Sequence, residues 1–521
     1  MNNLLCYPFY VVILSGVEGS HSKEKILRFH YVSLRMTAKK LLKYSISLLL
    51  IFSMFLLYGC GEAFLHKDTP LSVSTSDIFT DPARIESTVL GLYGTLKMDA
   101  DRQALLGGKM LVAFDNRGED MINVSNNIAS LYAVYLMTTG DANDECITFW
   151  RLAYRAINNA NTFLEKIESA RSLVGDANYA LYVAEARFVR AMAYYYLCMM
   201  YSKQPYMLNP NARAVPLRLQ AEINGKNNNL AASTVSEVFA AILEEIKDET
   251  ITALPVASAT YNAVTRATKG AALMLRVRVK MAMGNWDGAI ADATAITGYS
   301  LTPTVKAPFS SPYCTSENIF SLPMAANNVP NTQNSYEEYY YGTTNVMTVN
   351  MDAPGIISEA AYSQKGDARI ANFVEWNSAK GFHFLAKYTA TQKSDWIPVF
   401  RYAETLLNLA ECYAAKGGSS ETQAQALLKQ VRRRAIAEAD DIIKDADIEA
   451  LTGENLKTAI YKERRLELIG EGIRGIDIVR RGESFPAKGS GAQRVGAVSP
   501  SSANYMWPIP SSEKAINKLI D

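Results

Sequence analysis

The sequence predicts a mostly α-helical protein, in which tetratricopeptide-like helical hairpins form a scaffold that an irregular, partly β insertion interrupts. Apolar residues recur three or four positions apart through much of the chain, for example at Leu181, Ala184 and Phe188, which places them on one helix face. This periodicity stops between residues 300 and 395, where prolines and short β-like runs such as 382–388 replace it. A segment of this length is too large for an ordinary loop, so we interpret it as a functional insertion.

Residues 1–59 are expected to be absent from the working protein. Lysines at 39–43 precede an apolar run from Tyr44 to Tyr58, and Gly59-Cys60 follow, in the order of a bacterial export signal. A cut before a cysteine is the arrangement of a lipoprotein signal, so Cys60 is the predicted site of lipidation. The alternative is a retained transmembrane helix, but the apolar run is shorter than the roughly 20 residues that span a bilayer. Met36 stands where such a signal should begin, which makes residues 1–35 a doubtful extension.

Residues 60–300 are predicted to form the first, helical part of the mature chain. Asp81-Pro82 offers a helix start, and an apolar stripe at helical spacing runs from Ile85 to Leu96. Two further helical patterns, at 271–283 and 289–296, are separated by a polar turn at 284–288. This arrangement predicts a hairpin of the tetratricopeptide kind.

Residues 301–395 are the predicted insertion, and residues 396–521 form the C-terminal part. Segments 401–415 and 422–434 have helical periodicity on either side of Gly417-Gly418. Glycines between two helical patterns mark a turn, so these segments predict a second hairpin.

Composition argues against several classes of function. Residues 1–59 hold seven Lys and Arg but only two Asp and Glu, so the mature chain is slightly acidic and has no electrostatic reason to bind nucleic acid. Only His66 and His383 remain after processing, which argues against histidine-dependent catalysis and multi-histidine metal sites. No metal or cofactor is predicted. The cysteines of the body include no C-x-x-C pair, and their disulfide state stays open: Cys146, Cys198, Cys314 and Cys412.

Aromatic residues of the insertion are the candidate ligand contacts. The faces of aromatic rings stack on the apolar faces of sugars, and a tyrosine hydroxyl adds a polar contact. The alternative is that these rings pack the insertion's own small core. The candidates are Tyr336, Tyr339, Tyr340, Tyr341 and Trp376.

Residues 115–120, with the sequence DNRGED, are the second candidate segment. The segment is acidic enough to suggest calcium, but it lacks the alternating oxygen ligands and terminal glutamate of an EF-hand loop. We therefore expect a solvated loop in which Asp115 and Asn116 could hydrogen-bond a polar ligand.

Residues 470–475 match the dinucleotide-binding pattern G-x-G-x-x-G. That function requires a strand before the glycines, whereas a charged helical pattern, 462–469, precedes them here. The glycines are interpreted as a helix end and turn. Glu463 lies near the apolar stripe of that helix; because no second catalytic group is nearby, we interpret it as part of a buried ion-pair network rather than as a catalytic carboxylate.

Several segments together resemble the SusD/RagB family of outer-membrane nutrient-binding lipoproteins. The strongest is WIPVFRYAETLLNLAE at 396–411, similar to the family's RYAEvLLnyAEA helix. The runs 460–468 and 471–482 resemble its ERrrEL…EGhRwfDLrRwG motif, with Gly475 and Ile476 replacing an aromatic pair, and YMWPIP at 505–510 resembles its C-terminal ending. The charged residues of these motifs are scaffold residues in the family: Arg401, Glu404, Glu411, Glu463, Arg464, Arg474 and Asp477.

The resemblance implies a helical scaffold with an irregular portion that carries the ligand surface. It also implies a non-enzymatic, lipid-anchored protein on the outer membrane of a Gram-negative bacterium, facing the cell exterior. Such a protein captures oligosaccharides or peptides for a SusC-like TonB-dependent β-barrel transporter. None of these motifs contains a ligand-contacting residue of the family, so the resemblance identifies no ligand contact in this chain. The alternatives are a secreted glycoside hydrolase that uses paired carboxylates, and a tetratricopeptide-type adaptor without a small ligand.

Overall fold

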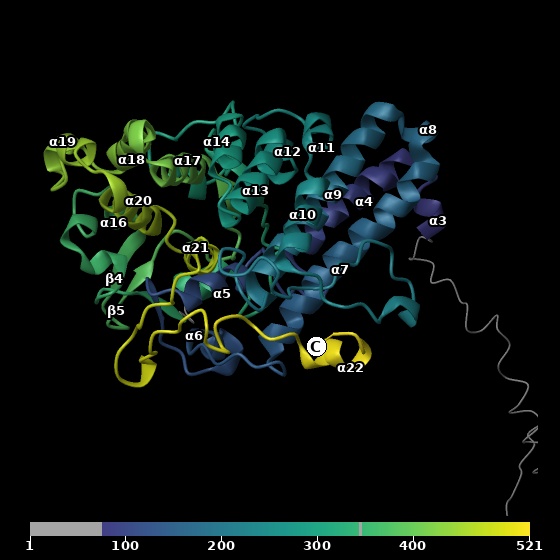
Figure 1. Cartoon of the computed structure of the whole chain (residues 1–521), viewed down its shortest axis with the longest axis horizontal. Helices are drawn as coiled ribbons and strands as arrows, with labels where there is room; N and C mark the ends of the chain where they lie inside the picture. The colour runs from purple at the N-terminus through teal and green to yellow at the C-terminus, as the bar shows by residue number, and fades with distance from the viewer. Residues whose placement is uncertain (1–74, 343–345, 521) are drawn as a thin grey trace, which may run out of the picture. The chain divides into compact units, whose positions relative to one another are not determined.

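The computed structural model describes residues 75–342 and 346–520, and Cys60 with the predicted signal lies outside them. Most of the secondary structure is α-helical, as predicted (Figure 1). The α-helices are α3 (Thr75–Ile78), α4 (Pro82–Lys97), α5 (Lys109–Arg117), α6 (Tyr132–Tyr135), α7 (Asp144–Ile167), α8 (Arg171–Val174), α9 (Asp176–Tyr201), α10 (Val235–Glu245), α11 (Asp248–Ala253), α12 (Tyr261–Thr265), α13 (Lys269–Ala282), α14 (Trp286–Thr294), α15 (Tyr336–Tyr340), α16 (Ala368–Phe373), α17 (Tyr402–Lys416), α18 (Glu421–Ala435), α19 (Asp445–Glu449), α20 (Gly453–Glu467), α21 (Arg474–Arg481) and α22 (Ser511–Ile516).

The strands form small antiparallel sheets of two strands each. The pairs are β1 (Met121–Asn123) with β3 (Met347–Val349), β2 (Asn318–Leu322) with β6 (Ile397–Arg401), and β4 (Val374–Asn377) with β5 (Phe382–Leu385). Two of these sheets join a strand from within residues 301–395 to a strand outside that segment. The insertion is therefore partly β, as predicted, and is hydrogen-bonded to the parts of the chain before and after it.

Helix α4 begins where the sequence indicates. The Asp81 side chain accepts a hydrogen bond from the Ala83 amide at 2.9 Å and so caps the helix, while Pro82 occupies its first turn. The apolar stripe from Ile85 to Leu96 is buried. It packs against the long helices α7 and α9, which also pack on each other (Figure 1).

Both predicted hairpins are present. Helices α13 and α14 pack on each other around the turn at Gly284, and α17 and α18 do so around Gly417 and Gly418. All three glycines have positive φ, a conformation that glycine adopts at little steric cost. Helix α17 also packs against α14 and α20, which links the two hairpins.

Most of the charged residues of the C-terminal motifs are buried as ion pairs. Arg401 is 2% exposed, and its guanidinium contacts carboxylates of Glu317 at 2.9 Å, Glu467 at 2.7 Å and Glu471 at 2.7 Å. Lys387 adds a second cation beside Glu471 at 2.7 Å. These arginine and lysine charges hold the pKa of Glu467 and Glu471 below the usual value despite burial, which by itself would raise it.

A second set of buried pairs joins α17, α20 and α21. Asp477 contacts Arg464 at 2.6 Å and Arg480 at 2.9 Å, and Arg480 in turn binds Glu411. The remaining motif residues are also paired: Glu404 with Arg278, Glu463 with Arg369 and Arg432, and Arg474 with Glu119. The ion-pair interpretation of Glu463 agrees with these contacts.

Gly472 and Gly475, two of the three glycines at 470–475, pack the chain against α5. Gly470 and Gly472 both have a φ of +74°, as expected for residues that end a helix and turn the chain. A Cβ on Gly472 would lie 2.7 Å from the Leu111 Cβ, and one on Gly475 would lie 2.4 Å from the Phe114 carbonyl oxygen. The motif therefore serves close packing, and the charged helix α20 rather than a strand precedes it.

The four cysteines of the described residues form no disulfide. Cys146, Cys198 and Cys412 are buried free thiols and Cys314 is a partly exposed one. No helix within residues 75–342 and 346–520 is long and apolar enough to cross a membrane.

Candidate functional site

The β4–β5 hairpin presents an exposed aromatic patch. Trp376 is 55% exposed and Phe382 is 41% exposed, and the Trp376 ring lies 4.9 Å from the His383 ring. The Tyr341 hydroxyl donates a 3.0 Å hydrogen bond to Glu375, the neighbour of Trp376. We call Tyr341, Trp376, Phe382 and His383 the hairpin patch. The sequence suggested two of its members, Tyr341 and Trp376, as ligand contacts; Tyr341 binds Glu375, whose side chain points to the opposite face of the strand from Trp376.

Three other candidates lie in the core, which corrects the expectation that they contact a ligand. Tyr336, Tyr339 and Tyr340 on α15 are each 2% exposed or less. The Tyr336 ring meets the Tyr388 ring edge-to-face at 4.6 Å, and the Tyr340 hydroxyl donates to Asp115 at 2.8 Å. These rings pack the interior because α15 lies against α5 and β3, so the alternative weighed for them, a core role, applies.

The segment at 115–120 is not the solvated loop that the sequence suggested. Asp115 and Asn116 belong to the last turn of α5 and are 3% and 0% exposed. The Asp115 carboxylate accepts hydrogen bonds from the Gly472 amide at 2.7 Å and from Tyr340. Asp115 and Asn116 therefore join α5 to the rest of the fold and are closed to a surface ligand. Elsewhere among the described residues, no group of three His, Cys, Asp or Glu side chains could hold a metal.

Burial gives Asp115 a pH-dependent effect on stability. It raises the pKa of this carboxyl to about 7, well above the value in an unfolded chain. The folded state therefore holds a proton that the unfolded state releases, so Asp115 favours folding below pH 4 and this contribution is lost as the pH rises to 7. We expect the free energy of unfolding of the wild-type protein, measured relative to Asp115→Asn in urea, to decline by at least about 1 kcal/mol between pH 4 and pH 7. Parallel profiles for both proteins would contradict this expectation.

An aromatic groove lies where the insertion meets the helices. It has a volume of about 460 Å³ and includes Leu90 and Tyr93 of α4, Tyr261 of α12, and Trp396. Tyr261 is 55% exposed and meets Trp396 edge-to-face at 5.4 Å, and Tyr313 stacks behind Trp396 at 5.4 Å. Tyr313, Trp396 and Tyr261 thus form a row of three aromatic rings, two of which line the groove.

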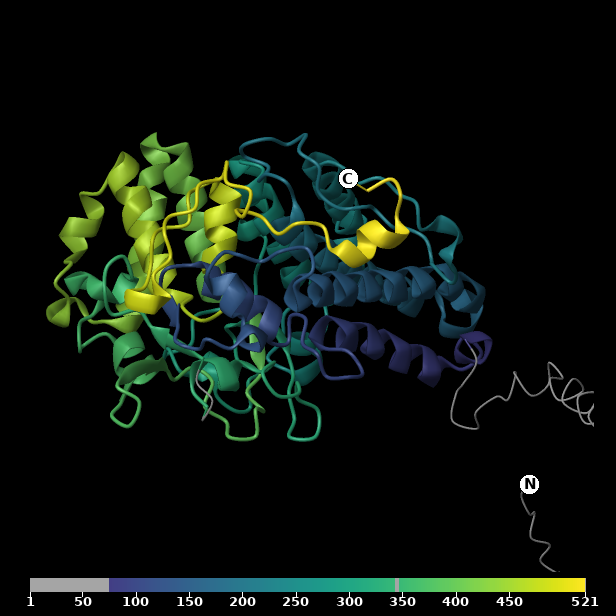
Figure 2. The ribbon, with the colours of Figure 1, turned by 90° about the horizontal axis from the view of Figure 1, so that it is seen from below.

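Polar groups border the aromatic groove. Asn262, Thr265 and Asn328 line it, and the Asp395 carboxylate accepts a 2.9 Å hydrogen bond from Tyr313 behind the row. Loops of the insertion, drawn in teal and green, project together from one face of the body (Figure 2). An apolar wall with a few hydrogen-bonding groups is the usual composition of a ligand-binding cleft.

Sequence reasoning missed the aromatic groove for identifiable reasons. Trp396 stands at the start of the segment 396–411, whose motif predicts a scaffold role. Tyr261 lies among the small and polar residues of 257–262, a context in which an aromatic ring is often exposed. The two rings are far apart in sequence, so only the tertiary structure brings them together.

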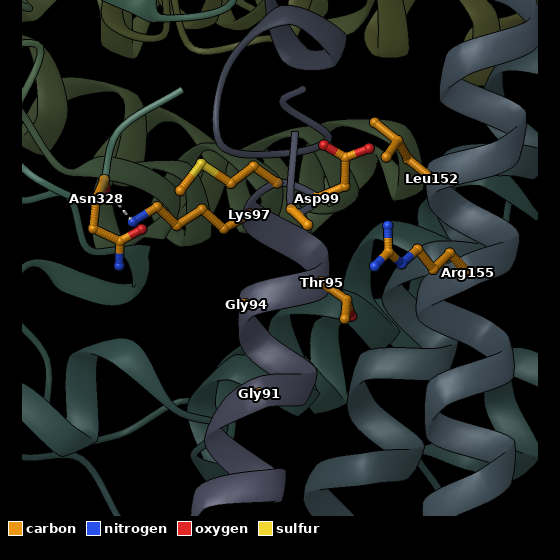
Figure 3. A pocket seen from close by; sticks show the side chains of 10 residues that line it. Gly91, Gly94, Thr95, Lys97, Asp99, Leu152, Arg155 and Asn328 are labelled. Carbon is orange, nitrogen blue, oxygen red and sulfur yellow. Dashed lines mark hydrogen bonds between the residues drawn. The ribbon is translucent and has the colours of Figure 1, made fainter. Parts of the chain in front are cut away.

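A second cavity lies at the C-terminal end of α4 (Figure 3). We call it the glycine pocket; its volume is about 310 Å³ and its lining includes Gly91, Gly94, Lys97 and Arg155. The two cavities share Gly94, Lys97 and Asn328. The Lys97 ammonium donates 2.7 Å hydrogen bonds to the carbonyls of Pro323 and Asn328, and its burial lowers its pKa to about 8.

Comparison with known proteins agrees with this architecture. A family model described as "SusD family" matches residues 324–520, and one described as "Starch-binding associating with outer membrane" matches residues 64–281. The crystal structure of a SusD superfamily protein from Bacteroides fragilis is 48% identical, with a TM-score of 0.80, and the match covers 85% of this chain and 100% of that one.

More distant relatives are similar along most of their length. A SusD-like carbohydrate binding protein from Bacteroides vulgatus is 20% identical, with a TM-score of 0.67 over 84% of this chain and 97% of that one. A SusD-like protein of Formosa agariphila is 23% identical over 501 residues, which cover 83% of this chain and 89% of the relative. The two family models, the shared fold and the 48% identity together show that the chain belongs to the SusD superfamily.

Proposed function

We propose that this protein captures oligosaccharides at the outer membrane and does not itself cleave them. The observation that carries the proposal is the aromatic groove, where the exposed Tyr261 ring and the Trp396 ring form an apolar wall. Sugar rings have apolar faces that stack on such rings, while their hydroxyls bond to amide and hydroxyl side chains such as those of Asn262, Thr265 and Asn328. The starch-binding description of one family model supports the same ligand class.

The hairpin patch is the proposed second contact. Trp376 lies on the exposed β4–β5 hairpin, and the partly exposed Tyr341 follows α15; both would stack on further residues of a long ligand. Peptides are the alternative ligand, because tyrosine and tryptophan also bind apolar side chains. A non-catalytic role accords with the arginine and lysine partners of the buried glutamates, whose carboxylates are committed to ion pairs.

The cellular role follows from the family and from the predicted anchor. We propose that lipid on Cys60 holds the protein at the outer membrane, with its body facing the cell exterior. There it would deliver ligand to a SusC-like TonB-dependent transporter. The description of one matching family as associating with the outer membrane supports this location.

An oligosaccharide and peptide array, probed with the full chain in detergent, tests the proposal. We expect oligosaccharides to bind, and calorimetry with Tyr261→Ala to show affinity reduced at least about 10-fold, as for loss of a central aromatic contact. Trp376→Ala is the matched aromatic change outside the groove and should weaken long ligands only.

Three other outcomes of these experiments would change the proposed function. Binding of peptides alone would replace the ligand class. Loss with Trp376→Ala but not with Tyr261→Ala would move the site to the hairpin patch. Release of shortened sugars from the bound ligand would overturn the non-catalytic role.

A further inference from the structure

The glycine pocket contains a cation that no carboxylate neutralises. Arg155 of α7 lines the pocket and is exposed, and it makes no hydrogen bond or ion pair with any part of the chain that the structure describes. Asp99, the carboxylate in the lining, is instead held by Arg151, whose guanidinium lies 3.1 Å from it. Arg151 also donates to the Gln103 side chain at 2.7 Å. The Asp99 carboxylate is thus already paired, and no carboxylate in the described part of the chain compensates the positive charge of Arg155.

Lys97 strengthens the positive potential of the pocket. Its ammonium is bonded to two backbone carbonyls, and no carboxylate lies in ion-pair contact with it among the described residues. Figure 3 shows Lys97 and Arg155 on either side of the α4 ribbon, with the Arg155 guanidinium directed toward the helix. Because α4 lies between the two cations, Lys97 adds a more distant attraction, and the Arg155 guanidinium is the group that a bound anion would contact.

The wall between these cations is bare backbone. Gly91 and Gly94 lie one turn apart on the exposed side of α4, and a Cβ at either position would meet no atom within 4 Å. Glycine inside a helix is unfavourable by comparison with alanine, so two such residues in one helix need a reason outside helix formation. Here they leave a shallow, unobstructed surface beside Arg155 on which a ring could lie.

We propose that the glycine pocket is a subsite for the carboxylate of an acidic sugar, so that the captured oligosaccharides are uronic acid-containing. This inference rests on the proposed function, because it extends the ligand from the aromatic groove into the adjoining cavity. The planar guanidinium of Arg155 binds the two oxygens of a carboxylate in parallel. The neighbouring sugar stacks on Tyr261, and continuity is provided by Gly94, Lys97 and Asn328, which line both cavities.

The test compares acidic oligosaccharides with their neutral methyl esters. Oligomers of galacturonate, glucuronate and mannuronate, each paired with its methyl ester, are titrated calorimetrically into the full chain in detergent. At least one acid should bind ten-fold or more tightly than its ester, and added salt should reduce the difference. Arg155→Gln should abolish this preference without weakening the ester, and Arg155→Lys should retain part of it.

Two further variants test whether the change in acid preference is specific to the glycine pocket. Gly91→Leu places a side chain in the open space of the pocket and should remove the acid preference in the same way. Arg494→Gln removes an exposed arginine from the C-terminal segment, outside both cavities, and should change nothing.

The results separate this inference from the proposed function. If neutral glycans bind at the aromatic groove but no acid exceeds its ester, or if Arg155→Gln keeps the preference, the inference is overturned and the proposed function stands. If sulfated oligosaccharides alone show the Arg155-dependent gain, the carboxylate assignment is replaced. Equal competition by an aspartate-rich peptide would overturn the sugar class. Absence of any glycan binding would overturn both proposals.

Discussion

Replacement of Arg401 by glutamine is expected to lower the free energy of unfolding by about 3–5 kcal/mol. The guanidinium contacts Glu317, Glu467 and Glu471, all nearly inaccessible to solvent. Without it, three buried carboxylates share the remaining cations, and a carboxylate that loses its partner must stay charged in a poorly solvated place or take up a proton.

Urea unfolding of the purified chain, followed by circular dichroism at neutral pH, measures this effect. Lys416→Gln is the control, because the Lys416–Asp287 pair is exposed and should contribute no more than about 1 kcal/mol. Arg401→Lys keeps the charge but not the forked geometry and should fall between the two. Equal losses for Arg401→Gln and Lys416→Gln would show that the buried network does not stabilise the fold.

Gly472→Ala is the second substitution for which we expect a large loss, about 2–5 kcal/mol. Two effects add. A φ of +74° is strained for alanine, and the new methyl group would lie 2.7 Å from the Leu111 Cβ and 2.9 Å from the Leu111 carbonyl oxygen. These atoms belong to the buried helix α5, which cannot move without disturbing Asp115 and its hydrogen bond to the Gly472 amide.

The matched control is Gly418→Ala, since Gly418 also has a positive φ, +59°, but a Cβ there meets no atom within 4 Å. It should lose only about 1–2 kcal/mol from backbone strain. Unfolding midpoints of the two variants in the same buffer isolate the packing contribution. If both variants lose the same amount, the glycine motif turns the chain without requiring close contact with α5.

The helical architecture could be predicted because its signals are local. Asp81, Pro82 and the stripe from Ile85 to Leu96 specify α4 within one stretch of chain, and hydrophobic periodicity requires no knowledge of the partner helix. The hairpin turns at Gly284 and Gly417 follow for the same reason, since they depend on residues that adopt positive φ. The breakdown of this periodicity likewise located the partly β insertion.

The candidate site could be predicted only in part. Trp376 and Tyr341 are accessible, whereas Tyr336, Tyr339 and Tyr340 are not, although all five belong to the same aromatic-rich insertion. The sequence alone does not distinguish the buried rings from the accessible ones, because the burial of each ring depends on the residues that pack against it.

The sequence by itself determined the main helices, the turns of the two hairpins and the family motifs, and it predicts the anchor at Cys60, because each rests on neighbouring residues or on a contiguous run. Only the tertiary structure decided which side chains face a ligand. Tyr340 meets Asp115, 225 positions away along the chain, and becomes core. Tyr261 meets Trp396 and becomes the wall of a groove. These outcomes differ because contacts between distant segments, rather than local residue type, set which aromatic surface remains in contact with water.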